Sequence, residues 1–159
     1  MPRISAGILL YRFGASGLEV LLVHPGGPFF RHKDLGAWSI PKGEAAEAED
    51  LLATARREFE EETGTAIDGT FQRLSPVRQK SGKIVHAWAV EGTLDPARVR
   101  SNTMKIEWPP RSGRLITVPE VDRAGFFAVP EAILKINVAQ SAFVRELVAL
   151  VGVTRREPA

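Results

Sequence analysis

The sequence predicts an α/β fold in which a mixed sheet lies between helices. Two observations predict it: short apolar runs with strand character occur before and after one strongly patterned helix, and two helical stretches close the chain. The 159 residues are enough for one domain with a sizeable core. We therefore expect a single domain over residues 1–153, followed by a flexible tail over residues 154–159.

The chain is predicted to begin with a β-hairpin. Ser5–Tyr11 is a short apolar run, Gly14–Gly17 is a turn, and Glu19–His24 returns as the second strand. The pieces that follow are a loop (29–36), a short extended segment (37–40) and a turn (41–43).

One helix is predicted from about Ala46 to Thr63. Acidic residues in its first turns suit the positive end of the helix dipole. Leu52, Ala55 and Phe59 are spaced at i, i+3 and i+7 and form a stripe that we expect to be buried. Gly64 is suited to end the helix in a left-handed conformation.

The second half of the chain is predicted to supply the remaining strands and the closing helices. Strands are expected at 71–78, 84–91 and 125–129, and helices at 130–135 and 142–151. Residues 95–119 are rich in proline and arginine, and we expect a long irregular loop there with a functional role.

Composition excludes several classes of function. The net charge of +2 is too mild for a nucleic-acid binder and is compatible with an anionic substrate. The absence of cysteine excludes disulfides, cysteine-ligated zinc and a cysteine nucleophile, and fits a reducing, cytoplasmic compartment. No apolar run is long enough to span a bilayer. We therefore expect neither DNA nor a membrane as partner.

The most specific pattern lies between Gly43 and Thr65. Glu58, Glu61 and Glu62 are spaced at i, i+3 and i+4 and therefore share one helix face. The alternative is an acidic face in solvent, but such carboxylates also match the oxygen ligands that Mg²⁺ prefers. The histidines have no ligand spacing and are expected to be structural or superficial: His24, His32 and His86.

This pattern resembles the Nudix box, GX5EX7REUXEEXGU, where U is a bulky apolar residue. Eight of its nine defined positions match, and Thr65 occupies the ninth. The resemblance implies an α/β/α sandwich and an enzyme that hydrolyses a phosphoanhydride bond in a nucleoside diphosphate linked to another moiety. It also implies Mg²⁺, with Mn²⁺ as a substitute. The whole chain is similar to a bacterial group of small predicted NTP pyrophosphohydrolases, which indicates no substrate.

The resemblance also assigns roles to individual residues. It implies that Glu58, Glu61 and Glu62 bind metal together with the backbone carbonyl of Lys42, and that Gly43 and Gly64 are structural. Glu49 and Arg57 match a pair that orients the catalytic glutamates, and Arg57 is also spaced to orient Glu61 directly. Glu120 occupies the place from which some members supply a general base, and Glu107 is the runner-up. The catalytic set is therefore Arg57, Glu58, Glu61 and Glu120.

The substrate is less defined than the reaction. The run from Trp38 to Gly43 resembles the W-x-x-P-K-G motif of dinucleoside polyphosphate and diphosphoinositol polyphosphate hydrolases, but a tyrosine typical of many of the former is missing. A dinucleoside polyphosphate or a nucleoside triphosphate is expected. Trp108 either stacks a base or packs its loop onto the core. The residues expected to contact substrate are Lys42, Trp38, Arg31, Lys33 and Lys80.

Two other functions are compatible with the sequence. The chain could be a catalytically silent module that binds or senses a nucleotide, although such modules often lose box glutamates. It could also be a structural protein with an acidic helix. RNA 5′-end hydrolysis is disfavoured by the mild charge and the lack of an evident RNA-binding patch.

Overall fold

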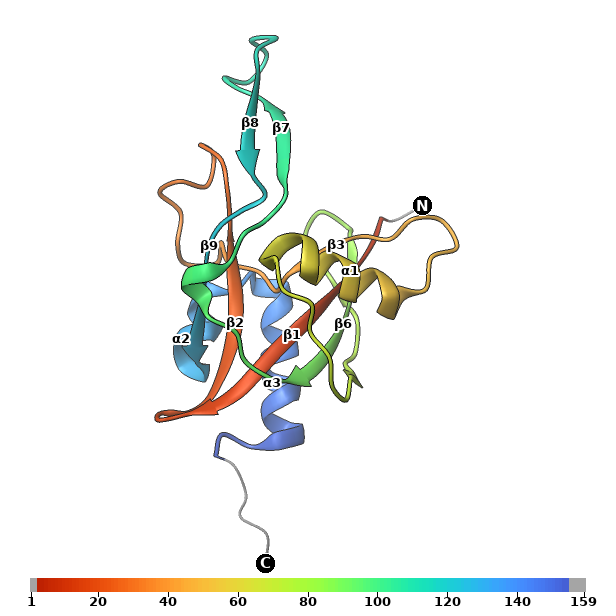
Figure 1. Cartoon of the computed structure of the whole chain (residues 1–159), viewed down its shortest axis with the longest axis vertical. Helices are drawn as coiled ribbons and strands as arrows, with labels where there is room; N and C mark the ends of the chain where they lie inside the picture. The colour runs from red at the N-terminus through yellow and green to blue at the C-terminus, as the bar shows by residue number, and fades with distance from the viewer. Residues whose placement is uncertain (1–2, 155–159) are drawn as a thin grey trace, which may run out of the picture.

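A seven-stranded mixed sheet forms the centre of the protein, whose computed structural model describes residues 3–154 (Figure 1). Its strands are β1 (Ile4–Gly14), β2 (Gly17–Pro25), β3 (Lys42–Glu44), β4 (Gln72–Arg73), β5 (Val77–Arg78), β6 (Ile84–Glu91) and β9 (Val121–Ala128). The order across the sheet is β4-β6-β1-β2-β9, with β3 beside β1 and β5 beside β6. Only the β1–β6 pair is parallel; the other pairs are antiparallel.

Helices cover both faces of this sheet. They are α1 (Leu51–Thr63) on one face and α2 (Val129–Lys135) and α3 (Ser141–Val151) on the other, with short 3₁₀ turns η1 (Pro96–Arg98) and η2 (Val138–Gln140) (Figure 1). Side chains of β1 alternate between the two layers, since successive residues of a strand point to opposite faces. Ile8 and Leu10 pack in one buried cluster with Phe59 of α1, whereas Leu9 packs in the other with Phe143 of α3. The predicted sheet between helices is confirmed.

The helix α1 begins later than predicted. It starts at Leu51, where the carboxylate of Asp50 accepts a hydrogen bond from the N–H of Ala53 at 3.0 Å and caps the helix. Ala48 has a φ of 62°, which a right-handed helix does not accommodate. Residues 46–50 therefore form a loop, and the acidic residues there do not belong to a first helical turn.

The other strands also differ from the prediction in extent. Residues 42 and 43 of the expected turn at 41–43 belong to β3, which pairs with β1. The expected strand 71–78 is interrupted: within it, residues 72–73 (β4) and 77–78 (β5) pair with β6 as two separate short strands. The last strand starts at Val121 instead of 125, since residues 121–124 pair with the end of β2.

Residues 95–119 are not one long irregular loop, which corrects the prediction. After η1 they form an antiparallel hairpin of β7 (Thr103–Glu107) and β8 (Leu115–Pro119), which projects away from the sheet (Figure 1). The carboxylate of Glu107 holds the hairpin tip by accepting hydrogen bonds from the N–H groups of Arg111 and Gly113 at 2.9 and 3.1 Å. Such side-chain contacts leave no periodic signal in the sequence.

Within residues 3–154, none of the helices combines the length and apolar character required to cross a membrane. Of the tail predicted at 154–159, residues 155–159 lie outside the described part of the chain. The single-domain boundary at 153 stays a prediction.

Candidate active site

The helix α1 turns an apolar side to the sheet and acidic residues to another side. Ala55 and Phe59 are fully buried, and Leu52 packs partly buried against the same cluster, as the stripe predicted. Gly64 has a φ of 78° and donates its N–H to the carbonyl of Glu60 at 2.7 Å, which ends the helix. Because Phe59 fixes the rotation of the helix, it also fixes where the box glutamates point.

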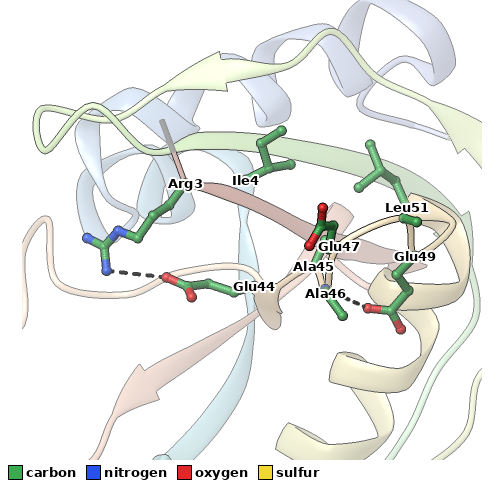
Figure 2. Close-up of a pocket in the computed structure, with 9 residues that line it drawn as sticks. Arg3, Ile4, Glu44, Ala45, Ala46, Glu47, Glu49 and Leu51 are labelled. Atoms are coloured by element: carbon green, nitrogen blue, oxygen red, sulfur yellow. Dashed lines mark hydrogen bonds and ion pairs between the residues drawn. The ribbon is translucent and has the colours of Figure 1, made fainter. Parts of the chain in front are cut away.

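The loop before α1 brings Glu49 towards the helix (Figure 2). Glu49 accepts the N–H of Ala46 at 3.0 Å, and Arg3 binds Glu44 at 3.2 Å across the same loop. A hollow of about 510 Å³ lies between this loop and the start of β1. Among the described residues, its lining includes Glu49 but none of the three glutamates predicted to bind metal. It is therefore separate from the acidic cluster.

Arg57 contacts three carboxylates. Its guanidinium lies 3.1 Å from Glu49, 2.8 Å from Glu58 and 3.2 Å from Glu61. The hydrogen bonds from Arg57 lower the pKa of Glu49 to about 2, and the N–H of Ala46 adds to this effect. The structure thus contains the Glu49–Arg57 and Arg57–Glu61 contacts that the sequence indicated, and it adds one to Glu58.

Glu58, Glu62 and Glu120 converge. Each offers a carboxylate oxygen, and these oxygens lie within 4.8 Å of one another. Burial raises the pKa of Glu62 to about 8; the charge of Lys42 opposes the rise, and those of Glu120 and Glu58 add to it. Burial also raises the pKa of Glu58 and of Glu120, and the nearby charge of Glu61 adds to both shifts. Acidic oxygens crowded in this way are unfavourable unless they are protonated or share a cation.

Main-chain hydrogen bonds place Glu120 beside α1. The N–H of Asn102 donates to the carbonyl of Glu61 at 2.8 Å, and the N–H of Glu120 donates to the carbonyl of Asn102 at 2.8 Å. Gly26 donates to the carbonyl of Glu120 at 3.0 Å from the opposite side. Glu120 therefore lies at the cluster, whereas Glu107, the runner-up for the general base, is engaged at the hairpin tip.

The turn before the box helix fits closely around the cluster. A Cβ atom at Gly43 would lie 2.0 Å from the carboxyl carbon of Glu58, so only glycine leaves that carboxylate in place. The N–H of Lys42 donates to Glu62 Oε1 at 3.4 Å, which sets the Lys42 peptide against the cluster. Burial and the neighbouring charge of Lys83 lower the pKa of the Lys42 ammonium, against the attraction of Glu62.

Lys42 stands between two small cavities that share Pro25, Ser39 and Lys42 itself. The first, of about 130 Å³, reaches Glu62 and Glu120. The second, of about 190 Å³, is lined by aromatic and amide side chains: Phe30, Trp38, Gln79, Asn137 and Gln140. The buried Gln140 accepts the N–H of Ile40 at 3.0 Å and donates to Gln79 at 2.9 Å. Sequence reasoning missed these amides, because single Asn and Gln residues form no recognisable pattern.

The predicted substrate residues are spread over several places. Trp38 lines the second cavity, but it is only 4% exposed and its indole N–H donates to Asp34 at 2.8 Å. The ammonium of Lys33 lies 3.6 Å from the centre of the Phe29 ring. Arg31 lines a further cavity, whose lining does not include Lys42.

The lysines of the β5–β6 turn differ from each other. Lys80 is exposed, whereas the side chain of Lys83 is 17% exposed and lies 3.8 Å from Glu44. Lys83 is also the charge that lowers the pKa of Lys42. The lysine of this turn whose charge acts on Lys42 is therefore Lys83.

His24 has a structural place, as expected from its lack of a ligand pattern. It is fully buried, with Nδ1 2.8 Å from Asp122 Oδ1 and Nε2 2.6 Å from the carbonyl oxygen of Lys33. These contacts join β2, β9 and the loop that follows β2.

Comparisons with known proteins agree with this fold. The family model of the NUDIX domain matches residues 1–147. A C. elegans Ap4A hydrolase in a binary complex has a TM-score of 0.65 and 21% identity, with 92% of this chain and 96% of that chain covered. The NUDIX domain of Shewanella oneidensis NrtR complexed with ADP ribose has a TM-score of 0.60 and 16% identity, with 93% and 89% covered.

A mutT/nudix family protein from Listeria innocua has a TM-score of 0.61 and 19% identity, with 95% of each chain covered. Identities of this size establish a shared fold. No match was found among curated proteins. Because the family match spans most of the sequence, the chain belongs to the NUDIX family, and the expectation of a Nudix pyrophosphohydrolase is confirmed at that level.

Proposed function

We propose that this NUDIX-family chain is a Mg²⁺-dependent enzyme that hydrolyses a phosphoanhydride bond in a nucleoside diphosphate linked to another moiety. The expected substrate is a dinucleoside polyphosphate or a nucleoside triphosphate. The observation that carries the proposal is the convergence of Glu58, Glu62 and Glu120 within 4.8 Å. Within this cluster Glu58 and Glu62 offer oxygen donors alone, which suits Mg²⁺ or Mn²⁺.

The residues fit a hard divalent cation. Glu58 and Glu62 would hold it, with the adjacent carbonyl of Lys42 as a further oxygen. Glu61, which Arg57 contacts, would be a further ligand. A cation bound there would neutralise phosphate oxygens and acidify a water molecule. The raised pKa values of the carboxylates, caused first by burial, indicate that the site is unfavourable as a purely anionic cluster.

The remaining residues bind, orient and accept a proton. Glu120 lies where it can take a proton from water, and the upward shift of its pKa by burial brings it closer to neutral pH, where a general base is effective. Arg57 holds Glu58 and Glu61 in one arrangement. Lys42 and Lys83 supply positive charge for the phosphate chain at the same edge of the site.

A substrate panel with Mg²⁺ and Mn²⁺ tests the proposal. Ap4A, nucleoside triphosphates and ADP-ribose are incubated with the wild type, and the products are separated by chromatography. Glu58→Gln and Glu62→Gln should abolish turnover, whereas Glu60→Gln, an exposed glutamate on the same helix, should retain it. Wild-type kcat in Glu62→Gln with Mg²⁺ present would contradict the proposal.

The alternative is a module that binds a nucleotide without cleaving it. It would show saturable nucleotide binding with no products from any substrate of the panel. The convergence of the box glutamates Glu58 and Glu62 with Glu120 favours the enzyme. The cysteine-free sequence favours a reducing compartment such as the cytoplasm.

A further inference from the structure

The hairpin β7–β8 forms one wall of a cavity that the proposed chemistry does not use. The hairpin projects from the body of the protein at the end of the sheet where β9 begins (Figure 1). The cavity has a volume of about 430 Å³ and lies between the hairpin and the loop that follows β2. The side chains that matter here are Pro28, Arg31, Trp108, Ile116, Val118 and Asp122.

The hairpin base is firmly attached to the catalytic region. Asn102, just before β7, links the carbonyl of Glu61 to the N–H of Glu120, just after β8. A Cβ atom at Gly27 would lie 3.5 Å from both Ile106 and Val118, so the loop after β2 packs directly on the hairpin. The walls of the cavity are therefore held in place by main-chain hydrogen bonds and by direct packing.

The cavity is chemically suited to a flat, neutral ring. Trp108 is half-buried, and Ile116 and Val118 provide an aliphatic surface beside it. Arg31 and Asp122 carry opposite charges, so a bare polyphosphate gains little there. A nucleobase can stack on an indole, and its amino group can donate to a carboxylate such as Asp122.

The cavity also adjoins the catalytic one. Pro119 and Asp122 line this cavity, whereas Glu120 and Val121, between them in the chain, line the cavity at Lys42. On the facing loop, Gly27 and Pro28 line this cavity, whereas Pro25, just before them, lines the cavity at Lys42. A ligand with its phosphates at Glu62 and Glu120 can thus extend from one cavity into the other, towards Trp108.

We propose that this cavity is a second subsite, which binds a nucleobase of the substrate moiety beyond the cleaved bond. The assignment rests on the proposed hydrolase function and narrows the substrate to molecules with two bases, such as dinucleoside polyphosphates. Trp108 stacks the base, and Asp122 accepts a hydrogen bond from its amino group through Oδ2, since Oδ1 contacts His24. Arg31 lies at the edge where the ribose and the last phosphate would pass.

Kinetics with one-base and two-base substrates test the subsite. Trp108→Leu should raise the KM for Ap4A at least about tenfold more than it raises the KM for ATP. Leu115→Ala is the matched control, since Leu115 is an exposed apolar residue of the same hairpin outside the cavity lining. Equal changes for Ap4A and ATP in Trp108→Leu, or a change no larger than in Leu115→Ala, would overturn the subsite.

A binding measurement on the wild type keeps the test independent of folding and turnover. In ¹⁵N-labelled protein the indole resonance of Trp108 is assigned with Trp108→Phe. AMP without metal should shift it saturably, and ribose 5-phosphate, which lacks the base, should not. An unmoved resonance, or an equal shift with ribose 5-phosphate, contradicts the proposal.

The two proposals fail in different ways. If the wild type cleaves no nucleotide with Mg²⁺, the hydrolase proposal fails, and the indole titration alone decides the cavity. If the wild type cleaves Ap4A but Trp108 responds to neither test, only the subsite fails. A shift of the Trp108 resonance with protein concentration and no nucleotide would show a second copy of the chain in the cavity, which also overturns the subsite.

Discussion

Replacing Glu62 with glutamine is expected to stabilise the metal-free protein at neutral and alkaline pH. Burial raises the pKa of Glu62 from 4.5 to about 8. Between these two values the folded protein holds a proton that the unfolded chain releases, so the free energy of unfolding falls as pH rises. Glutamine keeps the shape of the side chain and does not titrate, so the free energy of unfolding of the variant does not fall for this reason.

The size of the effect follows from the difference between the pKa values of Glu62 in the unfolded and the folded protein. Each pH unit in which the two states differ by one proton changes the free energy of unfolding by about 1.4 kcal/mol. From the ordinary value of 4.5 to a folded value of about 8, the contribution accumulates to roughly 4–5 kcal/mol. For a chain of this length that corresponds to a difference in Tm on the order of 10 °C.

Denaturation in the presence of a chelator measures this difference. Urea unfolding of the wild type and Glu62→Gln is followed from about pH 5 to about pH 9, with Glu60→Gln as the matched exposed control. The two proteins should be most similar near pH 5 and should separate as pH rises. Addition of Mg²⁺ should restore stability to the wild type and do less for Glu62→Gln, because a ligand that binds the folded state stabilises it.

The outcome that refutes this reasoning is specific. If the stability of the metal-free wild type stays level with that of Glu62→Gln, or rises relative to it, as pH increases, then Glu62 is not a buried carboxyl in an anionic cluster. The Glu60→Gln protein should follow the wild type at every pH, which separates the effect of burial from that of removing any negative charge from α1.

Three further predictions concern space, packing and charge at the same site. Gly43→Ala should leave the fold intact but weaken Mg²⁺ binding at least about tenfold, because it displaces the Glu58 carboxylate. Isothermal titration measures this affinity. In a Glu58→Ala background, Gly43→Ala should not weaken Mg²⁺ binding any further. Phe59→Ala should lower the free energy of unfolding in urea by about 3–5 kcal/mol, since Phe59 is fully buried, whereas Phe29→Ala, at an exposed ring, should lower it far less. Lys83→Gln should raise the KM for Ap4A about tenfold in steady-state kinetics, and Lys80→Gln should not; equal effects would contradict the placement of Lys83.

Residues whose role depends on near neighbours in the chain were predictable. The faces of α1 follow from helical spacing, so the buried positions of Ala55 and Phe59 and the contact between Arg57 and Glu61 could be read from the sequence. The start of α1 was not predictable, because acidic residues favour both a first helical turn and a loop that caps a helix. The cap at Asp50 and the contact of Glu49 with Arg57 decide between them, and the second is a contact across eight positions.

Residues brought in by distant contacts left weaker signals. Lys83 and Lys80 are indistinguishable as turn lysines. The pairing of both β3 and β6 with β1 places Lys83 near Glu44 and Lys42. The hairpin β7–β8 is short, and its tip depends on one side chain, Glu107, that binds the main chain. A proline-rich stretch with such local side-chain contacts looks irregular to any search for periodicity.

The last glycine of the box affects a residue that lies outside it. Gly64 ends α1 with a φ of 78°, but a Cβ atom there would also lie 2.9 Å from the carbonyl oxygen of Arg100. The close approach lets the N–H of Arg100 reach the carbonyl of Thr63 at 3.0 Å, and two residues later Asn102 reaches Glu61 and Glu120. A side chain at position 64 would therefore push this segment away and move Glu120 from Glu58 and Glu62. The glycine and the glutamates of the box thus depend on each other through a segment some forty residues further along the chain, and a helix-ending role alone does not account for Gly64.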